Sequence, residues 1–474
     1  MMCRPCTSLA AATLAAVAFA LRGTGHAAES PVPAKAAASS SPIDRELARR
    51  DGPYGLTRVH ELHLNISRPE WDALKTTVVQ GGRGAANGAG AGGGESDRTD
   101  STTGRSYHIG GGFGGYFPWV HADLKFDDEA EIKDIGLRHK GNSSYTAAQG
   151  RLHSNLKLKT DFFGAKGSLD GDKTVNLSAG PVDPARLRET LSLALFRAAG
   201  VPAPRTAYVE VSLTVPGLQN HTLVGTYTMI ENVNKGFAKD FFPPGEGLLL
   251  KPERAGRYGI PAPASSWAAM IDTYRPQREA TPHEQQRMME FTNLVHQPDV
   301  KVFREKIGQY LDIDNFLRFI AVNALLVNMD SFLGGTHNYF LYLDPKDDRI
   351  RFIPWDMDRS FGSMGRGGTN LSMRTPFTSD NPLIYWLLDD PAILARYRAI
   401  VLEILRDVFN QTELTKLLTA VQAAVAPPLA REYSAKRLRG EGGYTTGGDG
   451  GIAAFIEDRL YYVNEQLAGR SPGF

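Results

Sequence analysis

The sequence predicts an α+β fold, with a β-rich N-terminal half, a helical C-terminal half and a cleft between them. Alternating apolar and polar residues mark strands at 59–66 and 156–162, whereas apolar residues at helical spacing dominate after about residue 284. The chain has 474 residues, of which 42% are hydrophobic, so it can bury one large core or two ordinary ones. A cleft between two such halves is a common place for a ligand.

Residues 1–28 have the features of a secretory signal peptide. Arg4 supplies a short basic region, residues 8–21 are apolar, and small residues follow near a cleavage position. The apolar stretch is too short for a membrane span, so we expect no stable span after cleavage. Both cysteines, Cys3 and Cys6, lie in this segment, which leaves the mature chain without disulfides. We expect a secreted, periplasmic or cell-envelope protein.

Composition divides the remaining chain into a linker at 29–54, rich in Ala, Ser and Pro, and one folded domain at 55–470. Fourteen glycines between residues 81 and 115 mark an insertion in that domain at about 80–115. They lack the spacing of a phosphate-binding P-loop, and no Gly-Lys-Ser/Thr follows, so we expect a flexible insertion. The formal net charge of +1 gives no reason to expect a nucleic-acid partner.

The N-terminal half contains one clear helix among its strands. Residues 183–200 place apolar side chains at helical spacing, and we expect Asp183 to cap this helix and Gly200 to end it. Strands are expected on both sides of it, at 118–127, 130–141, 156–162, 206–213, 225–233 and 247–253.

A helix, a polar loop and a β-hairpin are predicted in succession between residues 315 and 355. Asp330 and Asn338 lie in the loop, and Asp356 and Asp358 follow the second strand directly. In an extended strand the last two would point the same way, about 7 Å apart. Taken singly, Asp330 could be a helix-end cap, Asn338 a strand cap and the aspartate pair a turn.

The order of these groups favours phosphoryl transfer over those separate readings. Protein kinases place a catalytic-loop Asp and Asn before a hairpin and a metal-binding Asp after it, close to Phe-Gly. The reaction needs a carboxylate near the attacking hydroxyl and hard oxygen ligands for the Mg²⁺ that bridges the phosphates. The pattern therefore predicts a phosphoryl-transfer or nucleotide site.

Phosphate binding also requires cations and hydrogen-bond donors. An alternating strand can aim Lys157 and Lys159 into the cleft together. Glu231 ends an apolar strand and could pair with a phosphate-binding lysine, as a glutamate does in kinases. The candidates for cofactor binding are Lys157, Lys159, Arg138, Asn142, Ser143, Glu231 and Lys251. For each of them a solvated strand face, an ordinary turn or a strand end is the alternative.

Several segments resemble the spore coat protein H (CotH) kinase family, over about residues 57–468. They are GLRHKGNSSY, LKLKTDF, DPARLRETLSLALFRAAGVPAPRTAYVEV, MIENVNKGF, NMDSF with HNYFLYLD, IPWDMDRSFG and FIEDRLYYVNEQL. The resemblance implies an atypical, distantly kinase-like fold that uses ATP with Mg²⁺ or Mn²⁺ to phosphorylate Ser or Thr of secreted or surface proteins. It implies that Asp330 is the catalytic-loop aspartate and Asp356 the principal metal ligand, with Asn338 and Asp358 assisting.

The chain departs from the family pattern just before the LKLK strand, where a lysine pair is usual and this sequence has Leu-His-Ser-Asn at 152–155. Two other functions remain open for the same carboxylates. One is a Mg²⁺-dependent phosphohydrolase with water as the acceptor, and the other is a non-catalytic kinase-like scaffold of the cell envelope. The presence of all four polar groups favours an enzyme, whereas the scarcity of extracellular ATP favours a scaffold.

Overall fold

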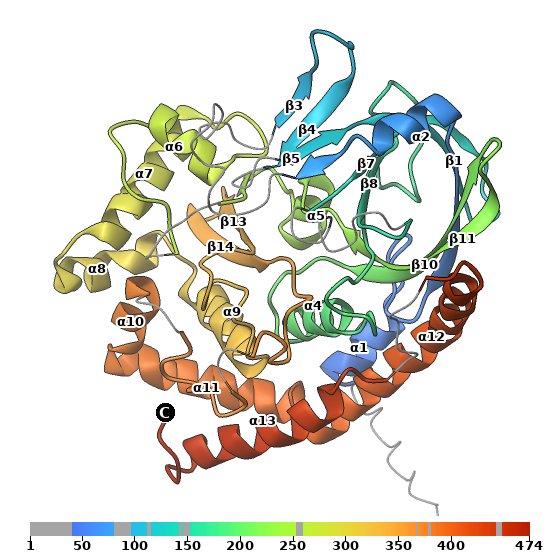
Figure 1. Ribbon diagram of the computed structural model, residues 1–474. Helices are drawn as coiled ribbons and strands as arrows, with labels where there is room; N and C mark the ends of the chain where they lie inside the picture. Colours follow the sequence, from blue (N-terminus) through green and yellow to red (C-terminus); the bar gives the residue numbers. More distant parts are fainter. Residues whose placement is uncertain are drawn as a thin grey trace, which may run out of the picture. The chain divides into compact units, whose positions relative to one another are not determined.

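The computed structural model describes residues 40–79, 96–110, 115–141, 145, 152–252, 259–365, 368–377, 381–441 and 448–474. Ser40–Phe474 form one unit. Within it, strands dominate up to Glu231, and helices dominate from Trp267 onward apart from one β-hairpin (Figure 1). The predicted α+β class is therefore confirmed.

Seven strands of the N-terminal half close into a barrel in the order β1-β10-β11-β9-β8-β7-β6. β1 pairs in parallel with β10 and antiparallel with β6. Alternate residues such as Leu62, Leu124 and Leu158 are almost fully buried in the barrel core, which explains the period of two in the sequence. The bounds are β1 Val59–Asn65, β6 Val120–Phe126, β7 Ile132–His139, β8 Leu156–Lys159, β9 Thr174–Ser178, β10 Thr206–Val215 and β11 Gln219–Glu231.

A smaller sheet, in the order β2-β5-β4-β3, contains part of the glycine-rich insertion. Arg105 pairs with Glu70 at 2.6 Å, and Trp119 Nε1 donates to Asp97 at 2.9 Å. Because these contacts and the strand pairing order residues 96–110, the expectation of a flexible insertion was wrong for that part. Residues 80–95 and 111–114 lie outside the described residues. The elements are α2 Arg68–Leu74, β2 Val78–Val79, β3 Ser96–Thr99, β4 Ser106–Gly110 and β5 Gly115–Pro118.

Helix α4 (Arg188–Ala198) is buried over most of its length and contacts α1, α9, α12 and β10. It begins at Arg188 and not at residue 183, because Arg186 adopts a left-handed backbone conformation with φ 57°. Asp183 does not cap the helix as predicted. It accepts the backbone N–H of Arg188 at 2.8 Å and pairs with the guanidinium of the same residue at 3.1 Å. This start places Glu189 in the first turn.

The C-terminal half combines helices with a three-stranded sheet in the order β12-β13-β14. Its core is aromatic where α9 packs on β14: the ring of Phe352 lies 4.8 Å from that of Phe316 and 5.2 Å from that of Phe332, between centroids. The helices are α5 Lys235–Phe241, α6 Trp267–Tyr274, α7 Pro282–His296, α8 Val300–Lys306, α9 Ile313–Leu325, α10 Pro382–Leu388, α11 Pro391–Asp407, α12 Gln411–Leu438 and α13 Ile452–Leu467. The strands are β12 Leu248–Leu250, β13 Tyr339–Asp344 and β14 Arg349–Pro354.

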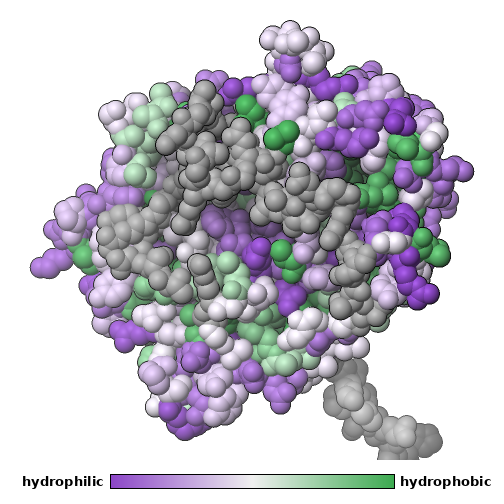
Figure 2. All heavy atoms as spheres, in the orientation of Figure 1, coloured by the Kyte–Doolittle hydropathy of each residue, from purple (hydrophilic) through white to green (hydrophobic). Residues whose placement is uncertain are grey.

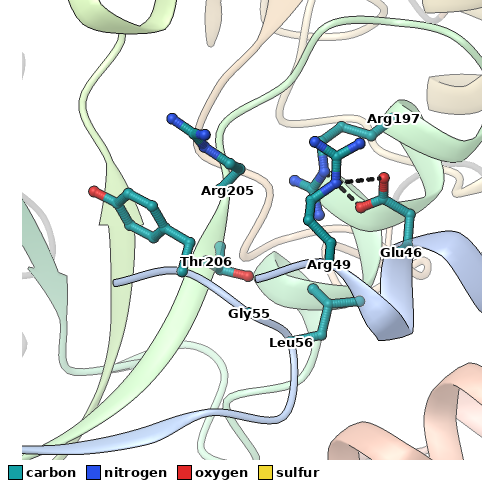
Figure 3. A pocket seen from close by; sticks show the side chains of 8 residues that line it. Glu46, Arg49, Gly55, Leu56, Arg197, Arg205 and Thr206 are labelled. Atoms are coloured by element: carbon teal, nitrogen blue, oxygen red, sulfur yellow. Dashed lines mark hydrogen bonds and ion pairs between the residues drawn. The ribbon is translucent and has the colours of Figure 1, made fainter. Parts of the chain in front are cut away.

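Part of the predicted linker is folded. Pro42–Ala48 form helix α1, which is capped by Ser41 and rests on α4 and α12 through the fully buried Ile43. Figure 3 shows Glu46 directed at Arg197 of α4 and at Arg49, with 2.7 Å between its carboxylate and Nε of Arg197. Both members of this ion pair are almost fully buried. The folded unit therefore begins before residue 55, because α1 supplies one half of a buried charge pair.

Helix α12 docks on β11 through a buried polar network. Glu432 accepts the backbone N–H of Thr226 at 2.7 Å and Nζ of Lys436 at 2.5 Å, and it pairs with Arg186 at 3.3 Å. Lys436 Nζ also donates to Nδ1 of His153 at 2.8 Å. Burial lowers the pKa of His153 well below its usual value, and the charges of Arg186 and Lys436 add to this effect. His153 is therefore neutral in the folded chain.

The described residues on the face seen in Figure 2 are mainly hydrophilic, and the hydrophobic ones stand in small separate groups. Large exposed hydrophobic side chains come from different elements, among them Leu218, Tyr385 and Leu438. Among the helices in the described part of the chain, none is long and apolar enough to cross a membrane.

We expect His153→Gln to make the fold less sensitive to acid. The unfolded chain takes up a proton at this histidine as the pH falls below about 6.5, whereas the folded chain does not. The contribution of the histidine to stability is therefore present above that pH and is lost as the pH falls. Glutamine can still accept from Lys436 but does not titrate. Between about pH 7 and pH 5 the melting temperature should fall less in the variant than in the wild type.

The matched control is His283→Gln, because His283 is exposed and pairs only across the surface with Asp348. The same change of pH slope in this variant would show that the effect does not depend on the burial of His153. Equal pH slopes for His153→Gln and the wild type would show that the buried histidine does not control acid stability.

Candidate functional site

The predicted succession of helix, loop and hairpin is present. Helix α9 ends at Leu325, the loop carries Asp330 and Asn338, and β13 and β14 form the hairpin that precedes Asp356 and Asp358. The pairing of Tyr339 with Pro354 brings the start of β13 beside the end of β14. The loop before the hairpin and the segment after it therefore lie next to each other.

Asp330 is held at the centre of this loop. Asn338 Nδ2 donates to the backbone oxygen of Asp330 at 2.7 Å, and the Asp330 carboxylate lies 3.5 Å from Nε2 of His337 and 3.5 Å from Nε of Arg359. Burial raises the pKa of Asp330. The charges of His337 and Arg359 oppose that rise and the charge of Asp356 adds to it. Asp330 is thus a half-buried carboxylate that is only partly neutralised.

The backbone around the site is strained. Val327, Thr336, Asn338, Asp356 and Phe361 all have positive φ, between 47° and 60°. A left-handed conformation costs a non-glycine residue on the order of 1–2 kcal/mol. Such residues gather at functional sites, where the surrounding packing enforces them. The expectation that Asp356 and Asp358 lie on an extended strand was wrong, because β14 ends at Pro354 and Asp356 turns the chain.

Glu189 joins these carboxylates from the other half of the molecule. It lies in the first turn of α4 and is 4% exposed. Burial raises its pKa well above the usual value, the charges of Asp356 and Asp358 raise it further, and Lys140 and the backbone of Met357 oppose the rise. The start of α4 is therefore packed against the segment that carries both aspartates.

Asp358 has the same character. Burial raises its pKa well above the usual value, and the charges of Asp356, Asp183 and Asp330 add to that rise. Asp356 itself is exposed. Four carboxylates thus converge on one place from α4, from the loop after α9 and from the segment after β14. Like charges so placed favour a bound cation or a shared proton.

No ready-made metal cluster is present among the described residues, since no three His, Cys, Asp or Glu side chains stand close enough to hold an ion by themselves. Mg²⁺ commonly takes one or two carboxylates and completes its shell with water and phosphate oxygens. Two hollows lie among the described residues. Glu46 and Arg205 are among the residues that line one of them (Figure 3), and Arg105 and Trp119 are among those that line the other. A cleft at the carboxylates therefore stays a prediction.

Lys140 faces the carboxylates, and Lys251 lies close to Lys140. Lys140, directly after β7, places Nζ 5.0 Å from the ring centre of Trp355, and Lys251, directly after β12, lies 5.9 Å from that of Phe340. The two rings are in edge contact, 5.4 Å apart between centroids. Burial lowers the pKa of Lys140, as does the charge of Lys251, whereas Asp356 and Glu189 oppose that change. The two ammonium groups thus each lie over one of two aromatic rings that are in contact with each other.

The other predicted cations lie on the outer face of the barrel. Arg138 and Lys157 are opposite each other in the β7–β8 register, on the side away from the barrel core. Arg138 is 5% exposed and packs on Trp119 at 5.0 Å. Lys159 lies over the ring of Phe162 at 5.6 Å. Of these, Arg138 is near enough to Lys140 to lower its pKa.

Glu231 is occupied elsewhere. Its carboxylate pairs with the Arg205 guanidinium at 2.5 Å and also accepts the backbone N–H of Arg205 at 2.9 Å. The expected pairing of Glu231 with a phosphate-binding lysine was therefore wrong, since an arginine fixes both of its oxygens. Asn142 and Ser143 lie outside the described residues.

Sequence reasoning missed Glu189 and Arg359 and did not select Lys140. Lys140 carried a usable signal, because it shares a strand face with Arg138. Glu189 had a weaker one, an acid at the start of an apolar helix, which is also an ordinary helix-start residue. Arg359 sits inside the DMDRSFG segment and showed no signal of its own.

Comparison with known proteins gives one family. A sequence model described as CotH kinase protein matches residues 137–463, which is more than half of the chain and includes Lys140, Glu189, Asp330 and Asp356.

The curated relatives are distant in sequence, and the two fungal ones are longer than this chain. The chain is 26% identical to Invasin CotH7 of Rhizopus delemar over 270 residues, covering 54% of this chain and 43% of that protein. It is 24% identical to Spore coat protein homolog 1 of the same fungus over 267 residues, covering 54% and 42%. It is 20% identical to Inner spore coat protein H of Bacillus subtilis over 295 residues, covering 62% and 77%. The chain thus spans less than half the length of the two fungal relatives.

Proposed function

Because the chain belongs to the CotH kinase protein family, we propose that it transfers the γ-phosphoryl group of ATP to a Ser or Thr hydroxyl of a secreted or surface protein. The observation that supports this most is the convergence of Asp330, Asp356, Asp358 and Glu189 opposite Lys140. Phosphoryl transfer consists almost entirely of positioning and charge stabilisation, which such a set of groups can provide.

The donor set fits Mg²⁺ or Mn²⁺. Burial raises the pKa of Asp330, Asp358 and Glu189 and the neighbouring carboxylates raise it further, so a divalent cation among these groups would favour their ionised forms. We assign Asp356 and Asp358 as ligands, together with Oδ1 of Asn338, since Nδ2 of that amide is bonded to the loop. A divalent cation held there would neutralise charge on the phosphates.

Lys140 and Lys251 are the proposed phosphate contacts. Each lies over an aromatic ring, and each lies close enough to the other for their charges to repel. An anionic group between the two ammonium groups would remove that repulsion. Glu189 then orients Lys140, which is the role that the sequence had suggested for Glu231. Lys157 and Lys159 remain candidates for the outer parts of the nucleotide, because they lie on the same face of β7 and β8 as Arg138.

Asp330 is the proposed base. Its carboxylate accepts the proton of the acceptor hydroxyl while the hydroxyl oxygen bonds to the γ-phosphorus and the bond from that phosphorus to the β-phosphate oxygen breaks, which releases ADP. The raised pKa of Asp330 makes this carboxylate a better proton acceptor than an ordinary aspartate. Arg359 and His337 flank it and hold it in place.

Export is part of the proposal. The curated relatives are named as invasins and as spore coat proteins, which places those proteins at a cell surface or in a spore coat. Residues 1–28 as a signal peptide would bring this chain to a comparable location, and the target would then be a protein met outside the cytoplasm.

The decisive experiment incubates the chain without residues 1–28 with γ-labelled ATP, Mg²⁺ or Mn²⁺ and a generic protein acceptor. Label on Ser or Thr of the acceptor supports the proposal. Label released only as free phosphate would replace it with a phosphohydrolase. Neither product, together with no nucleotide binding, would leave the scaffold function.

We expect Asp356→Ala to abolish nucleotide-dependent activity and to leave the melting temperature almost unchanged. The side chain is exposed and contributes charge to the site rather than packing to the core. The matched control is Asp128→Ala, an exposed aspartate in the turn after β6. Undiminished transfer by folded Asp356→Ala protein would overturn the metal assignment.

We expect Asp330→Asn to lose transfer but to keep most of its affinity for ATP and metal. The asparagine keeps the shape of the side chain and cannot accept the hydroxyl proton, so kcat should fall by about 10²-fold or more. Calorimetric titration with a non-hydrolysable ATP analogue and Mg²⁺ measures the affinity separately. Loss of nucleotide binding would make Asp330 a metal or phosphate ligand, and full activity would make it a cap for the end of α9.

A further inference from the structure

A buried hydrogen bond joins α4 to the segment that carries the two aspartates. Oγ of Ser192 and Oγ of Ser360 lie 2.6 Å apart, and both residues are fully buried. Ser192 is three residues after Glu189 in α4, so both side chains lie on the same face of the helix. That face therefore meets the segment 356–360 at two points, at Met357 through Glu189 and at Ser360 through Ser192.

The choice of serine at position 192 needs an explanation. A hydroxyl in a fully buried helix interior competes with the backbone and lowers helix propensity relative to alanine. Its neighbours on α4, Leu191 and Leu193, are apolar and equally buried. The bond to Ser360 satisfies the hydroxyl of Ser192. The serine therefore lowers the helix propensity of α4, and what it gains in return is the link to Ser360.

Segment 356–360 has little regular structure of its own to hold it. It follows the end of β14, begins with the left-handed Asp356 and is followed by the left-handed Phe361. Within it, the backbone N–H of Ser360 donates to the carbonyl oxygen of Met357 at 3.1 Å. Met357 is fully buried, and its sulfur accepts from Nδ2 of Asn328 at 3.2 Å. Met357 thus fixes the segment to the helical half, and Ser360 fixes it to α4.

From this geometry we propose that Ser192 and Ser360 are positioning residues, which set the place of Asp356 and Asp358 relative to Glu189. The proposal rests on the phosphotransferase function proposed above. Because both serines are fully buried, the pair acts from within the protein and keeps the acidic ligands from moving apart under their mutual repulsion. Misplacement of such a group by about 1 Å can cost about 10²-fold in rate, so loss of a single buried link is enough to matter.

The test uses the double variant Ser192→Ala/Ser360→Ala in the chain without residues 1–28. Removing both hydroxyls leaves no unsatisfied partner, so the melting temperature should stay near that of the wild type. The kcat should nevertheless fall about tenfold and the Mg²⁺ concentration for half-maximal activity should rise, with little change in the KM for the protein acceptor. Each single variant should show the same loss of activity with lower stability.

A matched double variant separates positioning from packing. Tyr274 and Thr292 form a hydroxyl pair of 2.5 Å between α6 and α7, and both residues are fully buried. Tyr274→Phe/Thr292→Val should therefore change stability as the serine double variant does and should leave kcat and the Mg²⁺ dependence unchanged. Equal effects of the two double variants on activity would overturn the proposal.

Two further outcomes are distinguishable. Wild-type kcat and Mg²⁺ dependence in a folded serine double variant would overturn the positioning role and leave the phosphotransferase function standing. Absence of both phosphotransfer and Mg²⁺-dependent ATP binding in the wild-type chain would overturn the function itself, and the inference with it.

Discussion

Negative charge concentrated in a partly buried volume is the constraint on which the rest of this structure depends. Burial raises the pKa of Glu189, Asp330 and Asp358, and the charges of neighbouring aspartates raise it further. Such groups separate unless a rigid framework holds them. The barrel half contributes Glu189 through α4, and the helical half contributes the aspartates through α9 and the hairpin. The site therefore exists only while the two halves are packed together.

Buried arginines supply much of that framework. Arg459 of α13 donates to the carbonyl oxygens of Ala324 at 2.9 Å and Leu325 at 3.3 Å, at the end of α9, and it also donates to Thr369 at 2.7 Å. Burial lowers its pKa to about 10. Because the end of a helix carries partial negative charge, a guanidinium there is stabilised without a carboxylate partner. Arg188 and Arg197 also hold the two ends of α4, but through ion pairs with the carboxylates of Asp183 and Glu46.

The sequence was sufficient for what depends on short-range pattern. Alternation predicted the barrel strands except β9, which the sequence analysis missed, and helical periodicity predicted α9. Residue order along one stretch selected Asp330, Asn338, Asp356 and Asp358, whose roles are proposals. Closure of the strands into a barrel was not predictable, because it depends on which strands pair and not on how each one alternates.

Side-chain partners were the least predictable part of the site. Glu231 and Glu189 are both glutamates at the edge of an apolar element, and only the fold shows that Arg205 occupies the first while the second faces Asp356 and Asp358. The start of α4 was misplaced for a local reason, the left-handed backbone at Arg186. Residues 42–48 were taken for a linker because a single helical turn or two has too few residues to show a periodic pattern.

The parallel pairing of β1 with β10 has a consequence for how the chain folds. Val59 lies beside Tyr208, so 208 − 59 = 149 residues separate the two partners in the sequence. Loop-closure entropy opposes contacts between such distant segments, and folding slows as the mean separation of contacting residues grows. Local pairs such as β6 with β7 can form early, whereas the barrel stays open until β10 has been synthesised and has found β1. In a growing chain the barrel therefore cannot close before β10 and β11, which ends at Glu231, have both been synthesised, and the strands made earlier keep unpaired edges until then.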